Sequence, residues 1–117
     1  MERAMEYAFW LLPLLLAVWF LKGRSGAKTK EAKMAAVDGA LVVDVRTPQE
    51  FAGRHYPGAL NIPVDQVQAR IKEFGDKNSP VVVYCQSGGR SQMAKQILES
   101  AGFTKVTNGG GVADMMR

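Results

Sequence analysis

The chain has 117 residues, enough for one domain of ordinary size with a short appendage, so we do not expect two domains. Its single cysteine cannot form an intramolecular disulfide, and cysteine usage therefore does not indicate a redox compartment. The formal net charge of +4 is uneven: residues 1–21 carry −1, residues 22–33 carry +4 and residues 34–117 carry +1. Because the basic excess belongs to one short segment, we expect no nucleic-acid-binding face on the folded body.

The first element is an uncharged apolar run at residues 7–21. As a helix it would be about 22 Å long, shorter than the ~30 Å hydrocarbon core of a bilayer. Aromatic residues lie at both ends, as at membrane interfaces, and Lys22 can snorkel. Glu2 and Glu6 argue against a cleaved signal peptide, and a buried helix would need a larger protein to cover it. We predict an uncleaved transmembrane anchor at residues 1–21.

Residues 22–33 are polar and lack an apolar face, so they are predicted to form a linker that can lie against anionic lipid headgroups. Their positive charges directly follow the apolar run. By the positive-inside rule, the protein is expected to be a single-pass inner-membrane protein with its folded body, residues 34–117, in the cytoplasm.

The first half of the body predicts a short helix at residues 31–39 and a buried strand at residues 40–45. Thr47 and Pro48 are typical of a helix N-cap and first turn, which predicts a short helix through Phe51. A brief strand is expected around residues 60–62. A helix is then expected within residues 64–75, with four residues on its apolar face and Gly75 at its end: Val64, Val67, Ile71 and Phe74.

The second half predicts a strand at residues 81–84 and a helix that begins near Ser91. Gly102 suits the left-handed position after that helix, with Phe103 folding back. A last short strand at residues 105–107 precedes a glycine loop at residues 108–111. The inner face of the helix is formed by Ala94, Ile97, Leu98 and Ala101. Alternating strands and helices predict an α/β fold with a parallel sheet covered by helices on both faces, whose functional crevice lies at the carboxyl ends of the strands.

Cys85 lies at such a strand end, and a small polar loop follows it: Gln86, Ser87, Gly88, Gly89 and Arg90. The loop can curl so that backbone N–H groups point at the sulfur, and together with the helix N-terminus they would stabilise a thiolate and lower its pKa. Arg90 adds a positive charge and a planar donor fork. The alternative is that Cys85 is a small buried hydrophobic residue. We favour a reactive nucleophile.

Other cysteine chemistries have less support. A Cys–His dyad is possible only through His55, the single histidine, and no sequence feature favours it. One cysteine and one histidine fall short of a metal site, so we expect neither a metal nor another cofactor. Asp44 ends a buried strand and is expected to organise the neighbouring loops, and Arg46 is expected to pair with Glu50, four residues on.

Three separated motifs, CQSGGRS at 85–91, DVRTPQEFAGRHYPGALNIP at 44–63 and NGGG at 108–111, resemble the single-domain rhodaneses, and the pattern is similar to the small phage-shock rhodaneses of bacteria. The resemblance covers residues 34–114. It implies that Cys85 accepts sulfane sulfur from thiosulfate or a persulfide and passes it to cyanide or a thiol. It also implies that the backbone amides of residues 85–90 hold the persulfide. The phage-shock relatives are generally exported, which leaves a periplasmic orientation open.

Two other functions remain open. A cysteine phosphatase of similar fold would have five residues between cysteine and arginine and usually a histidine before the cysteine, whereas four intervene here and Tyr84 precedes. The shorter loop suits one sulfur atom better than a phosphoryl group. A membrane-tethered persulfide carrier or partner-binding module with little turnover is the stronger alternative, because attraction for small dianions would depend on Arg90 alone.

Overall fold

The computed structural model describes residues 39–117. The expected anchor at residues 1–21, the linker at residues 22–33 and nearly all of the helix expected at residues 31–39 lie outside the described residues. Within residues 39–117, no helix has the length and apolar character needed to cross a membrane.

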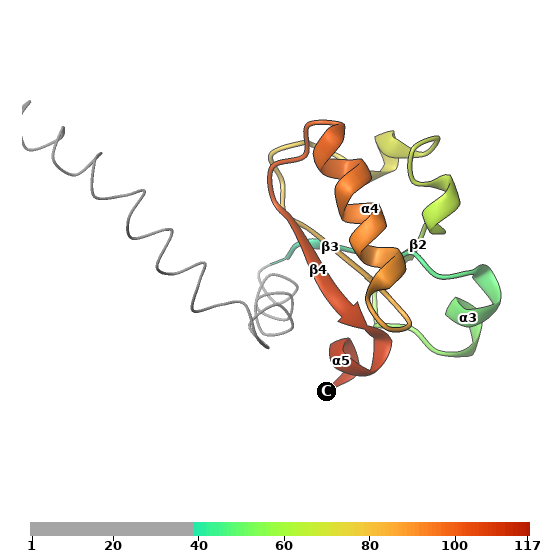
Figure 1. Ribbon diagram of the computed structural model, residues 1–117. Helices are drawn as coiled ribbons and strands as arrows, with labels where there is room; N and C mark the ends of the chain where they lie inside the picture. The colour runs from blue at the N-terminus through green and yellow to red at the C-terminus, as the bar shows by residue number, and fades with distance from the viewer. Residues whose placement is uncertain (1–38) are drawn as a thin grey trace, which may run out of the picture.

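A four-stranded sheet with strand order β2-β1-β3-β4 forms the centre of the domain, and all its pairings are parallel. The strands are β1 (Leu41–Asp44), β2 (Leu60–Asn61), β3 (Val81–Cys85) and β4 (Val106–Gly111). Since β3 lies between β1 and β4, its carboxyl end is flanked by residues that follow β1 and by the end of β4 (Figure 1). The prediction of a parallel α/β sheet is confirmed.

Helical elements connect the four strands of the sheet in chain order: α3 (Pro48–Gly53), the 3-10 helices η1 (Val64–Gln66) and η2 (Ile71–Phe74), and α4 (Gly89–Ser100). A further short helix, α5 (Val112–Met116), follows β4. Helix α4 covers one face of the sheet, together with the segment that contains η1 and η2 (Figure 1). The short helix α5 packs on the opposite face through Val112 and Met115. Helices therefore lie on both faces, as expected.

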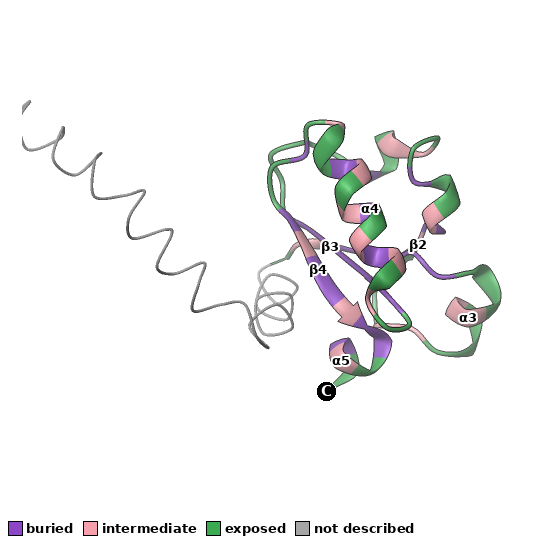
Figure 2. Ribbon diagram, in the orientation of Figure 1, coloured by how far each residue is buried: buried purple, intermediate pink, exposed green. Residues whose placement is uncertain are grey.

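Strand β3 is buried along its whole length (Figure 2). Its side chains alternate between two hydrophobic clusters. Val81, Val83 and Cys85 face the cluster under α4, whereas Val82 and Tyr84 face the cluster under α5. The sulfur of Cys85 is therefore directed to the side of the sheet from which α4 starts.

The prediction of one helix within residues 64–75 is wrong, because the segment forms two separate 3-10 helices. Its apolar residues come as two pairs three positions apart, Val64 with Val67 and Ile71 with Phe74. A spacing of three puts each pair on one face of a 3-10 helix, which has 3.0 residues per turn. All four side chains pack on the core as expected, and Gly75, with φ 79°, ends η2.

The end of α4 agrees with the prediction. Gly102 has φ 101°, and the backbone N–H of Phe103 donates to the carbonyl of Leu98 over 3.0 Å. Phe103 then folds back and packs edge-to-face on Phe74, with the ring centroids 6.3 Å apart. This cap fixes the turn that leads from α4 into β4.

The glycine loop expected at residues 108–111 is instead the second half of β4, which runs to Gly111. A Cβ atom on Gly111 would overlap the backbone carbonyl of Gln86. Absence of side chains thus allows β4 to continue beside the segment that follows Cys85, where Cys85 pairs with Gly111 after a register shift. The glycines permit close strand approach and do not mark a loop.

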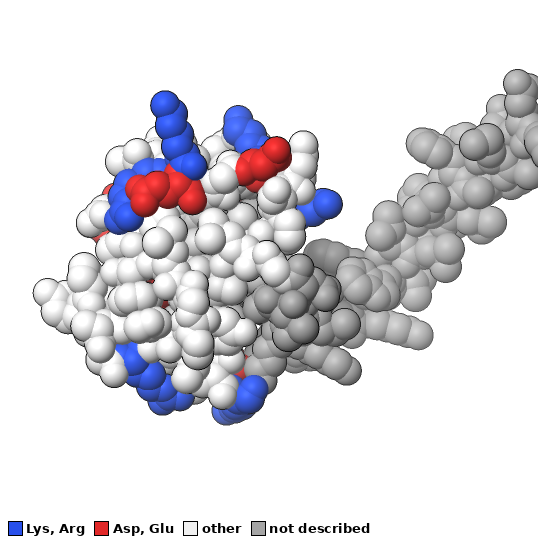
Figure 3. Space-filling model, turned by 180° about the vertical axis from the view of Figure 1, so that it is seen from behind, with Lys and Arg blue, Asp and Glu red and all other residues white. Residues whose placement is uncertain are grey.

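Charged side chains are unevenly placed on the face of the molecule opposite α4. Figure 3 shows this face: acidic and basic side chains lie together at its upper margin, lysine and arginine side chains lie at its lower margin, and uncharged residues occupy most of its centre. The positive charges of the described residues therefore do not form one continuous patch on this face.

Candidate active site

The cysteine loop begins where β3 ends and closes into the first turn of α4. Gly88 has φ 103°, a left-handed conformation that L residues rarely adopt, and it is the N-cap of α4. This conformation turns the backbone back over the end of the strand. Residues 85–90 therefore curl around the sulfur of Cys85, as the sequence predicted.

The sulfur of Cys85 is buried and accepts hydrogen bonds from its own loop. The backbone N–H of Gly88 lies 3.0 Å from Sγ, and the hydroxyl of Ser91 lies 3.4 Å from it. Burial raises the pKa of this thiol. The Ser91 hydroxyl and the backbone N–H groups of Ser91, Ser87 and Gly88 together outweigh that effect, so the pKa is lowered. The site therefore stabilises the thiolate relative to that of an ordinary exposed cysteine.

Ser91 contacts the sulfur of Cys85, and Asn108 in turn contacts Ser91. Ser91 Oγ lies 2.7 Å from Oδ1 of Asn108 and 3.0 Å from the carbonyl oxygen of Gly88. The side-chain amide of Asn108 donates to that carbonyl and to Gln92, while its oxygen accepts the N–H of Gly110. Asn108 thus ties the loop, α4 and β4 together and holds Ser91 next to the thiol.

Arg90 forms a two-pronged ion pair with Glu50 of α3, with N–O distances of 2.7 and 3.0 Å. The Arg90 guanidinium is the main reason that the pKa of Glu50 is lowered to about 2. Glu50 also completes a capping box with Thr47 at the start of α3. The expected pairing of Arg46 with Glu50 is therefore wrong. Arg46 precedes the N-cap, so the four-residue spacing does not lie on one helix.

Arg46 instead pairs with Asp44, and both side chains are buried. The carboxylate of Asp44 accepts from the backbone N–H, Nε and Nη2 of Arg46, and the hydrogen bond to Asp44 is the main reason that the pKa of Arg46 is raised. The remaining nitrogen, Nη1, donates to the Gln86 side chain over 3.3 Å. Asp44 therefore positions Arg46, and Arg46 holds the side chain of Gln86, the residue after Cys85. This agrees with the organising role expected of Asp44.

His55 has a different environment. Its Nδ1 donates to the carbonyl of Phe51 over 2.8 Å, and its ring stacks on that of Phe51 with centroids 3.7 Å apart. These contacts join His55, which follows α3, to Phe51 within α3. Among the described residues, no hydrogen bond joins His55 to Cys85.

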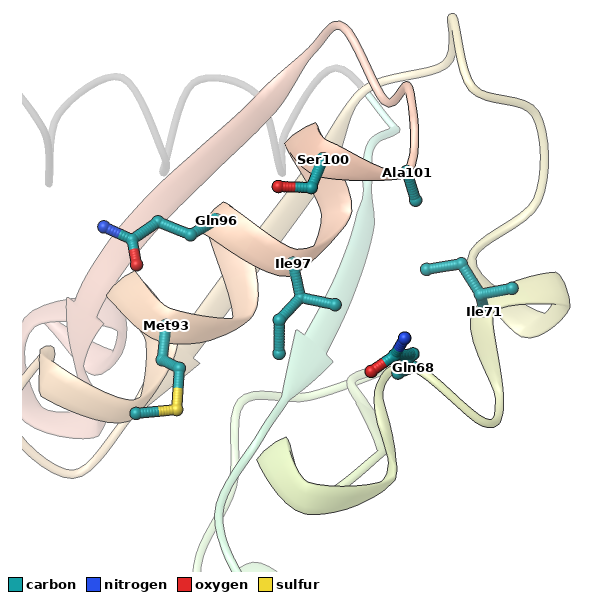
Figure 4. A pocket seen from close by; sticks show the side chains of 7 residues that line it. All are labelled: Gln68, Ile71, Met93, Gln96, Ile97, Ser100 and Ala101. Carbon is teal, nitrogen blue, oxygen red and sulfur yellow. The ribbon is translucent and has the colours of Figure 1, made fainter.

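A cavity of about 390 Å³ lies between α4 and the segment of η1 and η2 (Figure 4). Its lining is formed by Gln68, Ile71, Met93, Gln96, Ile97, Ser100 and Ala101. None of these residues belongs to the loop from Cys85 to Arg90, and none is charged. Cys85 and the loop that follows it therefore do not line this cavity.

Sequence reasoning missed three residues of the site: Glu50 as the partner of Arg90, Ser91 as a donor to the sulfur, and Asn108 beneath it. A signal existed for Asn108, because it follows the strand predicted at residues 105–107. The carboxyl ends of parallel strands lie at the same edge of a sheet, so a polar residue there is expected near Cys85. Ser91 directly follows the loop, within the first turn of the helix. No local signal connects Glu50 with Arg90, which lie 40 positions apart.

Known proteins resemble this chain in sequence and in fold. The family model described as the rhodanese-like domain matches residues 27–113. The chain is 45% identical over 74 residues to thiosulfate sulfurtransferase PspE of Escherichia coli K12, a match that covers 62% of this chain and 71% of that protein. It is 33% identical over 88 residues to thiosulfate sulfurtransferase GlpE of Pseudomonas syringae, covering 75% of this chain and 82% of that protein.

Solved structures agree in fold. A rhodanese from E. coli superimposes with a TM-score of 0.62 at 43% sequence identity, covering 65% of this chain and 91% of that one. Since this identity is well above the level at which only a fold is shared, the likeness extends to the sequence as well as to the architecture.

Proposed function

Because the chain belongs to the rhodanese-like domain family, we propose that Cys85 carries sulfane sulfur as a persulfide from thiosulfate or a persulfide donor to cyanide or a thiol. The chain is an enzyme, a sulfurtransferase of the rhodanese type. Persulfide chemistry requires a cysteine, and Cys85 is the only one in the sequence. The relatives PspE and GlpE are named as thiosulfate sulfurtransferases, which supports this assignment.

One observation carries the proposal: the sulfur of Cys85 is buried, backbone N–H groups of its loop point at it, and the Ser91 hydroxyl lies 3.4 Å from it. These donors stabilise negative charge on the sulfur whether it is a thiolate or a persulfide. Gln86, Ser87, Gly88, Gly89 and Arg90 form the proposed persulfide-binding loop. Asp44 and Arg46 support it through Gln86.

The two half-reactions balance without a cofactor. In the first, the Cys85 thiolate attacks the outer sulfur of thiosulfate, the sulfur–sulfur bond breaks, and its electron pair leaves with sulfite. Cys85 then carries a persulfide anion. In the second, cyanide attacks the outer sulfur of that persulfide, which releases thiocyanate and regenerates the Cys85 thiolate.

The purified full chain, mixed with thiosulfate and cyanide, should form thiocyanate, and Cys85→Ser should abolish this. Mass spectrometry of the chain after thiosulfate alone should show the gain of one sulfur atom, which cyanide removes. Thiocyanate formation by Cys85→Ser at the wild-type rate would refute the assignment.

A persulfide carrier with little turnover is the second candidate. The ion pair of Arg90 with Glu50 favours it, because it offsets the positive charge that would attract thiosulfate. Rapid loading followed by slow discharge to small acceptors would identify a carrier, whereas fast repeated discharge identifies an enzyme with broad acceptor use. A phosphatase would hydrolyse an aryl phosphate in a vanadate-sensitive manner, and we expect no such activity.

The protein is also proposed to be anchored in the inner membrane by residues 7–21, with the rhodanese domain on the cytoplasmic side. The apolar run and the basic segment after it support this. The full chain should remain with the membrane fraction after a high-salt wash, and deletion of residues 1–21 should release it. An impermeant thiol reagent added to intact cells should leave Cys85 unlabelled; labelling would instead place the domain in the periplasm.

A further inference from the structure

Glu50 of α3 bonds to Arg90, the last residue of the cysteine loop, through both carboxylate oxygens. Both side chains are about one-third exposed, so small solutes can reach the ion pair. The backbone N–H and hydroxyl of Thr47 donate to Oε1 of Glu50, which fixes the carboxylate in place. The ion pair therefore has a fixed geometry and joins α3 to the loop.

The pair leaves the loop with little net charge. Arg46, which contacts the loop through Gln86, is paired with Asp44, and Arg90 is paired with Glu50. Both arginines that contact or belong to the loop thus have a carboxylate partner. The remaining charge of the site is the thiolate of Cys85 itself. Among the described residues, the two arginines that contact or belong to the loop therefore give a dianionic donor such as thiosulfate little net attraction toward this anion.

We propose that Glu50 is a specificity-determining residue that, by neutralising Arg90, disfavours dianionic sulfur donors relative to donors of lower charge. This inference rests on the proposed function and specifies its donor class. The favoured donors are monoanions and uncharged organic persulfides. With an organic persulfide, the Cys85 thiolate attacks the outer sulfur, the sulfur–sulfur bond breaks, and the donor leaves as a thiolate while the outer sulfur keeps its proton on Cys85.

Two donors of similar shape and different charge test this. Thiosulfate carries two negative charges, and methanethiosulfonate carries one and releases methanesulfinate when its outer sulfur is taken. The kcat/KM for each donor reports the loading step alone in a two-step exchange reaction. In Glu50→Gln, we expect kcat/KM to rise about five-fold for thiosulfate and about two-fold for methanethiosulfonate. High salt should shrink both increases.

Glu73→Gln is the matched control. Glu73 forms a similar two-pronged pair with Arg70 on η2, at distances of 2.6 and 2.8 Å, and its neutralisation changes the net charge of the protein by the same amount. It should leave the ratio of the two donors unchanged. In the double variant Glu50→Gln with Arg90→Gln, the ratio should return toward the wild-type value. If Glu50 only held the loop in shape, Glu50→Gln would lower kcat/KM for both donors equally, which would overturn the inference.

A second measurement does not depend on sulfur transfer. Iodoacetate carries one negative charge and iodoacetamide carries none, and Cys85 is the only thiol that either reagent can alkylate. Glu50→Gln should raise the ratio of the iodoacetate rate to the iodoacetamide rate about two-fold. An unchanged ratio would overturn the inference. A raised ratio in a protein that gains no sulfur from either donor would support the inference and refute the proposed function.

Discussion

The hydroxyl oxygen of Ser91 lies 3.4 Å from the sulfur of Cys85, and both residues are buried. The hydroxyl has one proton, and besides the sulfur it can donate to the side-chain oxygen of Asn108 or the carbonyl of Gly88. A thiolate is a stronger acceptor than either of these neutral oxygens. Ionisation of Cys85 is therefore expected to turn the Ser91 hydroxyl toward the sulfur.

Ser91→Ala should raise the pKa of Cys85, because it removes a donor to the thiolate while the thiol stays buried. The pH dependence of iodoacetamide alkylation measures this shift. Ser87→Ala is the matched control: it keeps the backbone N–H that Ser87 directs at the sulfur, so the pKa should change less. A pKa that is the same in Ser91→Ala and in the wild type would show that the Ser91 hydroxyl does not stabilise the thiolate.

Loading of Cys85 by thiosulfate should rise with pH and level off once the thiol is ionised, with its midpoint below the ordinary thiol value of about 8.5. Since folding lowers this pKa, the thiolate also stabilises the folded state. That contribution is present in full above the unfolded pKa and is lost as pH falls through the folded pKa. The difference in unfolding free energy between wild type and Cys85→Ala should change accordingly. A loading midpoint above the ordinary value would contradict the geometry.

Asp44→Ala should lower the free energy of unfolding by about 3 kcal/mol or more, because it leaves the buried guanidinium of Arg46 without its carboxylate. Urea denaturation measures this difference. In Glu73→Ala, which breaks the exposed pair with Arg70, the loss should be much smaller. Equal losses in the two variants would show that burial of the Asp44–Arg46 pair does not increase the contribution of the pair to the free energy of unfolding.

Gly111→Ala should destabilise the domain by about 1–3 kcal/mol, because a methyl group there would overlap the carbonyl of Gln86. It should also slow persulfide loading, since Gln86 directly follows Cys85. Gly53→Ala is the control: a methyl group there would meet no atom of another segment within 4 Å, and alanine at the end of α3 should leave stability unchanged or raise it by up to about 1 kcal/mol. Normal loading by Gly111→Ala would show that β4 can move away from the loop.

Much of the fold could be predicted from the sequence, because its signals are local. The cap at Thr47, the stop at Gly102 and the buried strand that ends in Cys85 each depend on a few neighbouring residues. The spacing of four residues between Cys85 and Arg90 likewise predicted a loop that closes on the sulfur.

What could not be predicted depends on contacts between distant segments. The partner of Glu50 is set by where α3 lies relative to α4, and the four-residue spacing from Arg46 suggested the wrong pair. The extension of β4 through its glycines depends on the backbone of Gln86 beside it, which composition alone cannot show. Turn-forming residues predicted a loop there, and the pairing with β3 overrode that local preference.

The candidate site combines residues 44–50, 85–91 and 108–111, which meet only after β1, β3 and β4 have paired. Such pairings join positions far apart in the chain and form late relative to local helices and turns. An incompletely folded chain therefore has a cysteine of ordinary acidity, which is less readily oxidised than an activated thiolate. Cys85 is therefore expected to become a reactive thiolate only after these three strands have paired. The rate at which Cys85 becomes reactive should report this final step of folding.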